Sequence, residues 1–188
     1  LIFFETFTDL YELKAALLAA KENSTLPILA SMSFEAGGRT FTGCTVESYA
    51  VTAAGLGADA LGINCSLGPK EIFPMAKRLA EALPGEFPVF VKPNAGLPRA
   101  DGSGYDITPQ LFAMQMKPYR ALNLFAAGGC CGTTPEFIRL LNGVFDGCKP
   151  GREAHRLPSV LCSPVDFVTV DGITVVGERI NPTGKKRF

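Results

Sequence analysis

Short apolar runs alternate with longer amphipathic stretches along most of the chain. The apolar runs predict strands at residues 1–5, 27–33, 58–64, 88–92 and 120–127. The stretches between them repeat their apolar residues at helical spacing and carry helix-start residues, so they predict helices at 9–21, 45–56, 68–83, 108–118 and 134–145. The pattern therefore predicts strand-then-helix units of about 30 residues each.

This alternation is typical of a parallel sheet with helices packed outside it. Five such units fit an open doubly wound sheet or a part of a (β/α)8 barrel, which typically needs about 250 residues. The chain has 188 residues and starts at Leu1, inside a predicted strand and without an initiator Met. We therefore expect an α/β protein that forms a partial (β/α)8 TIM barrel whose first units are missing.

The character of the chain changes after residue 148. Residues 149–166 are rich in Pro, Arg, Gly and Ser and are predicted to form a linker. Residues 167–176 alternate around Asp171-Gly172, which is a hairpin signal. The predicted domains are an incomplete barrel at 1–148, the linker at 149–166 and the start of a second domain at 167–188.

Composition and charge exclude several classes of protein. The 18 Lys and Arg balance 18 Asp and Glu, whereas a nucleic-acid-binding protein shows a basic excess. No apolar run approaches the roughly 18–20 residues of a membrane helix. A disulfide framework is disfavoured because Cys130 and Cys131 are neighbours, and a bridge between adjacent residues is strained. We expect a cytoplasmic protein with reduced thiols.

Three cysteines follow predicted strands and are the main chemical signal. Cys65 follows the strand at 58–64, while Cys130 and Cys131 follow the strand at 120–127. These positions can converge because functional residues of such barrels lie where strands end and loops begin. Three thiolates form a zinc-binding set, and catalytic zinc sites keep the fourth position open. A substrate thiol bound there would be held as a thiolate, which points to alkyl transfer to sulfur.

The remaining cysteines and the histidine are expected to be structural. Cys44, Cys148 and Cys162 are predicted core residues, and Cys44 is the candidate that could close a structural four-sulfur site. The sole histidine, His155, lies in the predicted linker and is not a credible catalytic base.

Three segments resemble the homocysteine-binding domain of cobalamin-dependent methionine synthases. They are Gly62-Ile63-Asn64-Cys65, Pro93-Asn94-Ala95-Gly96-Leu97-Pro98 and Gly128-Gly129-Cys130-Cys131-Gly132-Thr133-Thr134-Pro135. The resemblance covers about residues 1–148 and implies a (β/α)8 barrel whose fourth to eighth strands are present. It also implies that Cys65, Cys130 and Cys131 are the zinc ligands.

The same resemblance implies two substrate-binding residues. Glu5, in Phe4-Glu5-Thr6, matches the family carboxylate that meets the substrate amino group. An ammonium group needs such an anionic partner. A helix-capping or surface role for Glu5 stays open. Asn64 either touches the substrate or orients the ligand loop.

The implied function is zinc-dependent methyl transfer from methylcobalamin to homocysteine, which gives methionine. Cobalamin and methyltetrahydrofolate would be bound by cobalamin-binding and pterin-binding domains of the same polypeptide. Residues 176–184 resemble the start of the methyltetrahydrofolate-binding domain, which betaine-dependent and S-methylmethionine-dependent relatives lack. The alternatives are a betaine- or S-methylmethionine-type homocysteine methyltransferase and a non-catalytic zinc-binding fragment. We expect the isolated fragment to lack full activity.

Overall fold

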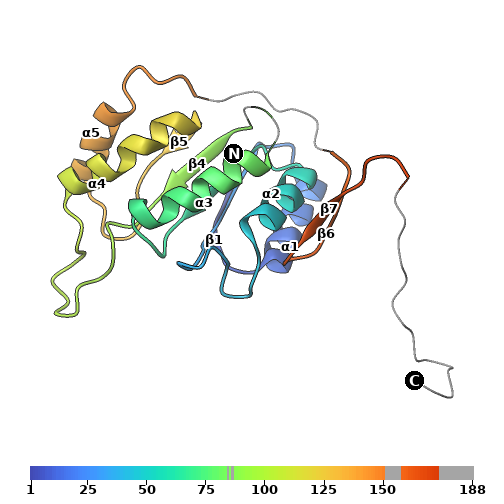
Figure 1. Cartoon of the computed structure of the whole chain (residues 1–188), viewed down its shortest axis with the longest axis horizontal. Helices are drawn as coiled ribbons and strands as arrows, with labels where there is room; N and C mark the ends of the chain where they lie inside the picture. Colours follow the sequence, from blue (N-terminus) through green and yellow to red (C-terminus); the bar gives the residue numbers. More distant parts are fainter. Residues whose placement is uncertain (84, 86, 151–157, 174–188) are drawn as a thin grey trace, which may run out of the picture.

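The computed structural model describes residues 1–83, 85, 87–150 and 158–173 (Figure 1). The strands are β1 (Ile2–Phe7), β2 (Ile28–Met32), β3 (Ala60–Asn64), β4 (Val89–Lys92), β5 (Ala126–Ala127), β6 (Val160–Cys162) and β7 (Phe167–Thr169). The helices are α1 (Leu10–Asn23), α2 (Val46–Gly55), α3 (Pro69–Ala82), α4 (Pro109–Met116) and α5 (Pro135–Val144), with a 3-10 helix, η1 (Lys117–Leu122), directly after α4.

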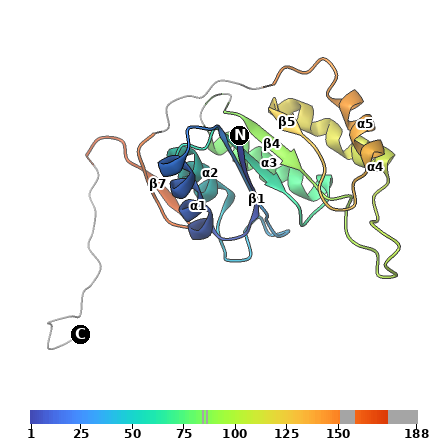
Figure 2. The same ribbon diagram turned by 180° about the vertical axis from the view of Figure 1, so that it is seen from behind.

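The first five strands form one parallel sheet in the order β1-β2-β3-β4-β5. Each connection steps to the next strand in the same direction, and right-handed connections of this kind place the helices on one face of the sheet. Consecutive helices pack against one another from α1 to α5. Helices α2 and α3 lie in front of the sheet in Figure 1, whereas β1 and β4 lie in front of α3 in Figure 2. The predicted α/β class is confirmed, and the sheet is singly wound rather than doubly wound.

The helices begin close to the predicted positions, at capping residues and prolines in the sequence. Asp9 caps α1 by accepting hydrogen bonds from the backbone N–H groups of Tyr11 and Glu12. Thr45 caps α2 in the same way through Ser48 N–H. Such side-chain oxygens satisfy backbone donors that have no partner inside the helix. Helices α3, α4 and α5 each begin at a proline, which has no N–H to satisfy.

The helix-facing side of the sheet is a continuous apolar core. Strand residues on this side are fully or almost fully buried: Ile28, Ala30, Met32, Leu61, Ile63, Val89 and Val91. The buried Tyr49 of α2 forms hydrogen bonds to the sheet within this core. Its hydroxyl donates to the carbonyls of Ala30 and Gly62 and accepts from Gly62 N–H at 3.1 Å. Tyr49 therefore links α2 to both β2 and β3.

The opposite face of the sheet is concave. The rings of Phe3 in β1 and Phe90 in β4 meet edge to face with centroids 5.4 Å apart. Three strand spacings separate β1 from β4, which is about 14 Å in a flat sheet. Gly62 of β3 provides the room, because a Cβ there would lie 2.3 Å from the Phe90 ring. Strong curvature brings the two rings together, and together with Leu29 and Ala126 they line a pocket of about 120 Å³.

Two predicted segments differ from the structure. The strand expected at 120–127 is reduced to Ala126–Ala127, because residues through Leu122 form η1 and Asn123 turns the chain with a φ of 47°. The linker expected at 149–166 contains strand β6, which pairs antiparallel with β7. The turn between β6 and β7 therefore lies before β7, whereas the predicted turn at Asp171-Gly172 lies after it. The second arm of the hairpin predicted around Asp171-Gly172 falls outside the described residues.

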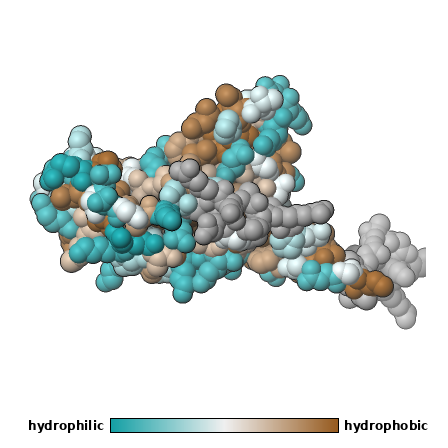
Figure 3. Space-filling model, turned by 90° about the horizontal axis from the view of Figure 1, so that it is seen from above, coloured by the Kyte–Doolittle hydropathy of each residue, from teal (hydrophilic) through white to brown (hydrophobic). Residues whose placement is uncertain are grey.

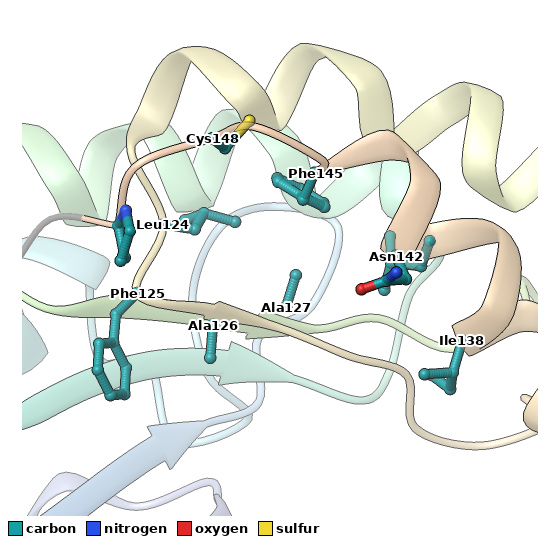
Figure 4. Close-up of a pocket in the computed structure, with 10 residues that line it drawn as sticks. Leu124, Phe125, Ala126, Ala127, Ile138, Asn142, Phe145 and Cys148 are labelled. Atoms are coloured by element: carbon teal, nitrogen blue, oxygen red, sulfur yellow. The ribbon is translucent and has the colours of Figure 1, made fainter.

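Strand β5 borders an apolar pocket of about 250 Å³ beside α5. Figure 4 shows its lining, which includes Leu124, Ala127 and Phe145. Phe125, directly before β5, is 41% exposed, and Leu1, directly before β1, is 71% exposed. Figure 3 shows hydrophobic residues gathered on the surface seen from above. Both edges of the sheet thus keep apolar surface. None of the helices described is long and apolar enough to cross a membrane.

Candidate metal and substrate site

The three cysteines that follow β3 and β5 converge in space. The Sγ atoms of Cys65, Cys130 and Cys131 all lie within 4.8 Å of one another. The Cys65–Cys131 separation is 3.7 Å and the Cys130–Cys131 separation is 3.9 Å. Four sulfurs at about 2.3 Å from a zinc ion would lie about 3.8 Å apart. Two of the three thiol separations thus match the edge of a zinc–sulfur tetrahedron.

Hydrogen bonds from the intervening strand end hold the backbone of these cysteines. Cys65 N–H donates to the carbonyl of Lys92, and Cys130 N–H donates to that of Pro93 at 2.8 Å. The buried side chain of Asn94 accepts from Cys131 N–H at 3.1 Å. The end of β4 and the loop after it therefore hold the backbone of all three cysteines, although they contribute no sulfur.

The backbone near the thiols adopts unusual conformations. Thr6, Cys65 and Ser66 all have φ between 58° and 65°, a left-handed conformation that costs free energy for residues other than glycine. Thr6 also lies where the pairing of β1 with β2 shifts register. Such strain persists only where surrounding contacts enforce it, and it clusters at functional sites.

Glycine next to the cysteine pair allows a close approach of another loop. Gly132 has a φ of 78°, and a Cβ on it would lie 2.3 Å from the ring of Tyr105. The pKa of the Tyr105 phenol is raised, first by desolvation and then by the neighbouring Cys131 thiol. The loop before α4 thus lies against the cysteine pair.

Asn64 connects the thiols to the carboxylate of β1. Its side chain is fully buried at the end of β3, where Oδ1 accepts from Ser31 Oγ at 2.8 Å and from Thr6 N–H at 3.2 Å. Its Nδ2 donates to Thr6 Oγ1 and lies 3.5 Å from Glu5 Oε1 and 3.8 Å from Cys130 Sγ. These contacts favour a positioning role for Asn64, because the amide is already satisfied by protein partners.

Glu5 lies at this same end of the sheet, where it forms an ion pair with Lys92 of β4. The Lys92 ammonium also lies 5.2 Å from the centroid of the Phe3 ring. The Glu5 and Lys92 side chains are 38% and 26% exposed, so the pair is open to a ligand from one side.

The close packing of the thiols affects their protonation. Burial raises the pKa of Cys130 to about 11, and the neighbouring Cys65 and Cys131 add to the rise because like charges repel. The cluster is therefore suited to thiolates only when a positive charge lies among them.

The other cysteines have different environments. Cys44 is fully buried, as predicted, and its thiol donates to the carbonyl of Thr45. It is not among the thiols grouped within 4.8 Å, so it does not complete a four-sulfur set. Cys148 is half-buried, and Cys162 is exposed, so the predicted core position of Cys162 is wrong. His155 lies outside the described residues.

Sequence reasoning missed Lys92, Thr6 and Tyr105 as neighbours of the site. Lys92 ends a strand two residues after Phe90, so the alternation of β4 could have placed it on the concave face. Tyr105 carries no comparable signal, because its position depends on the path of a loop.

Comparisons with known proteins identify the family of the chain. A family model described as homocysteine S-methyltransferase matches residues 1–145. The chain is 34% identical to the methionine synthase of Mycobacterium tuberculosis (strain ATCC 25618 / H37Rv) over 198 residues, which cover 100% of this chain. It is also 34% identical to the methionine synthase of Mycobacterium leprae (strain TN) over 98% of its length. The chain spans only 16% of either relative.

A solved structure shares the fold. The crystal structure of the homocysteine methyltransferase MmuM from Escherichia coli, in its apo form, matches with a TM-score of 0.61 at 24% sequence identity. The match covers 77% of this chain and 49% of that one. The matched part of this chain thus corresponds to about half of that structure.

Proposed function

Because the chain belongs to the homocysteine S-methyltransferase family, we propose that it is the thiol-activating part of a methionine synthase. In this proposal, zinc held by Cys65, Cys130 and Cys131 activates homocysteine for methylation. The observation that carries the proposal is the convergence of these three thiols within 4.8 Å. Within the described residues, no fourth His, Cys, Asp or Glu ligand atom joins the group, which leaves a position for a substrate sulfur.

The residues present fit zinc in number, type and spacing. Two sulfur separations of 3.7 and 3.9 Å match the edge of a zinc–sulfur tetrahedron. When bound, zinc would act as a Lewis acid that keeps the homocysteine sulfur as a thiolate and thereby makes it a nucleophile. The exposed thiol of Cys131 marks the side from which substrate would enter.

The rest of the site positions the amino acid. Glu5 carries the negative charge that the homocysteine ammonium needs, and charge-assisted hydrogen bonds of this kind are strong. Asn64 holds Thr6 and approaches both Glu5 and Cys130, so it keeps the carboxylate at a fixed distance from the thiols. This division of roles raises the rate by holding the reacting sulfur in place.

The methyl donor in this proposal is methylcobalamin, carried by another domain of the same polypeptide. The methionine synthase matches extend over 98 to 100% of this chain, whereas the family match ends at residue 145. The segment after residue 145 therefore also resembles methionine synthases. This favours the start of a pterin-binding domain at 167–188, after a connection at 149–166 that contains β6, and it favours methylcobalamin over a small donor such as betaine.

The concave sheet further supports a closed barrel in the longer protein. A singly wound parallel sheet with helices outside and an apolar concave face is the arrangement of a (β/α)8 barrel. We propose that β1 to β5 are its fourth to eighth strands. The free edges at β1 and β5, with the pocket beside α5, would then receive the remaining strand–helix units.

X-ray absorption at the zinc edge tests the proposed site. The purified chain, loaded with zinc, is expected to show three protein sulfurs, and addition of homocysteine is expected to raise the number to four. The Cys44→Ala variant is the matched control and should behave like the parent chain. Four protein sulfurs without homocysteine, or no change when homocysteine is added, would contradict the proposal.

A further inference from the structure

The ion pair between Glu5 and Lys92 differs from the other ion pairs in the described part of the chain. Those pairs join residues of the outer helices, such as Arg78 of α3 with Glu47 of α2. The Glu5–Lys92 pair instead joins two strands, β1 and β4, across the concave face. Two further strands lie between them. The lysine side chain thus reaches across the concave face towards β1.

The surroundings of Lys92 hold its side chain in this direction. Its aliphatic part lies near Gly128, where a Cβ would be 3.4 Å from Lys92 Cγ. Its ammonium lies over the Phe3 ring, and such cation–π contacts are attractive. Lysine has three N–H donors, and within the described residues Glu5 is its one ion-pair partner. The ammonium therefore has donors left for a second anion.

The Glu5 carboxylate likewise has only part of its hydrogen-bonding capacity occupied by protein groups. Both its ion pair with Lys92 and its contact with Asn64 involve Oε1. In the described part of the chain, Oε2 has no hydrogen bond of its own. A carboxylate can accept several hydrogen bonds, so Oε2 is available to an incoming ammonium group.

The pair lies at a distance that suits an amino-acid thiol. Asn64 Nδ2 is 3.5 Å from Glu5 Oε1 and 3.8 Å from Cys130 Sγ, so Glu5 Oε1 and Cys130 Sγ are at most 7.3 Å apart. Two methylene groups and one α-carbon separate the thiol of homocysteine from its charged groups. The molecule can therefore place its sulfur among the cysteines while its charged end meets Glu5 and Lys92.

We propose that Lys92 is a specificity residue that binds the α-carboxylate of the amino-acid substrate while Glu5 binds its α-ammonium. This inference rests on the proposed function. The substrate end is a zwitterion, and the Glu5–Lys92 pair offers one charge of each sign. Placed together, the four charges alternate in sign, so each has an opposite neighbour. A thiol that lacks either charged group would leave one member of the pair without its ligand.

Binding of three thiols to the cobalt(II)-loaded chain tests this inference. The thiols are homocysteine, 3-aminopropanethiol, which lacks the carboxylate, and 4-mercaptobutyrate, which lacks the ammonium. The sulfur-to-cobalt charge-transfer absorption gives a Kd for each. Lys92→Met is expected to weaken homocysteine and 4-mercaptobutyrate about tenfold and to leave 3-aminopropanethiol unchanged or tighter. Glu5→Gln is expected to weaken homocysteine and 3-aminopropanethiol and to spare 4-mercaptobutyrate.

Two further variants complete the design. Lys92→Arg keeps the positive charge and should retain most of the affinity for homocysteine, and Lys77→Met removes a lysine from the outer surface of α3 and should change nothing. Equal weakening of all three thiols by Lys92→Met would overturn the inference, since it would mean that the lysine only supports the fold. Unchanged binding of all three would overturn it too. If the parent chain binds cobalt but no thiol alters its spectrum, the proposed function itself fails.

Discussion

The two faces of the five-stranded sheet use the same strands for different purposes. On the helix side, the strand residues, such as Leu61 and Ile63 of β3, are apolar and fully or almost fully buried. On the concave side the character changes within two residues, from Phe3 to Glu5 in β1 and from Phe90 to Lys92 in β4. Because successive side chains of a strand point to opposite faces, one strand can serve both faces independently. Substitutions on the helix face should therefore alter stability, and those at the strand ends should alter ligand binding.

The largest effect is expected at the thiols. Cys131→Ala removes an exposed ligand, so it should lower zinc affinity at least about a thousandfold while leaving the fold intact. Competition with a chromogenic zinc chelator measures the affinity, and circular dichroism checks the fold.

Cys162→Ala is the matched control, since Cys162 is also exposed but lies outside the cluster. It should keep the affinity of the parent chain. A Cys131→Ala protein with unchanged zinc affinity would show that the strand ends do not form the metal site.

The convergence of the thiols could be predicted because it depends on a general rule. Cys65 and Cys130 follow strands, and the carboxyl ends of parallel strands meet at one mouth. Their partner Cys131 is adjacent in sequence. The helices were also predictable, since caps such as Asp9 and Thr45 are local signals.

The alternation of β4 could place Lys92 on the concave face, but its contact with Glu5 could not be predicted, because that contact depends on curvature. Its ammonium reaches Glu5 only because the sheet bends, and the bend depends on the contact of Phe90 with Gly62 and Phe3. No local pattern encodes that contact. The shortening of β5 also depends on a contact between residues far apart in the sequence. The apolar run at 120–127 is typical of a strand, but the Arg120 guanidinium donates to the carbonyl of Val144 and thereby links η1 to the end of α5.

A second prediction compares truncation on the two faces. Ile63→Ala removes a fully buried side chain from the helix-facing core and should lower the free energy of unfolding by about 3 kcal/mol. Leu29→Ala acts on the half-buried concave face, where water already reaches part of the side chain, and should cost about 1 kcal/mol. Urea denaturation of the metal-free chain measures both. Equal losses would mean that the concave face is as well packed as the helix face.

A third prediction concerns the polar link inside the apolar core. Tyr49→Phe keeps the ring but leaves Gly62 N–H without its acceptor and two strand carbonyls without their donor. A buried backbone group left without a partner costs about 1 to 3 kcal/mol, so the free energy of unfolding should fall by about 2 kcal/mol. Zinc affinity should not change, because the hydroxyl lies on the helix side of the sheet. A loss of zinc affinity together with stability would show that the two faces are coupled.

The smallest effect is expected from the outer ion pair of Arg78 with Glu47, which contrasts with the Glu5–Lys92 pair on the concave face. The Arg78 guanidinium holds the pKa of Glu47 below its ordinary value through two hydrogen bonds, at 2.6 and 2.7 Å. A lowered carboxylate pKa means that the unfolded chain takes up the proton first, so this stability is complete above the ordinary value of 4.5 and is lost as the pH falls through the native pKa. Because both side chains are partly exposed, the contribution should be at most about 1 kcal/mol. Glu47→Gln should flatten the acid dependence of unfolding below pH 4.5 and leave homocysteine binding unchanged, as measured by urea titrations at several pH values. An acid dependence equal to that of the parent chain would show that this ion pair does not stabilise the contact between α2 and α3.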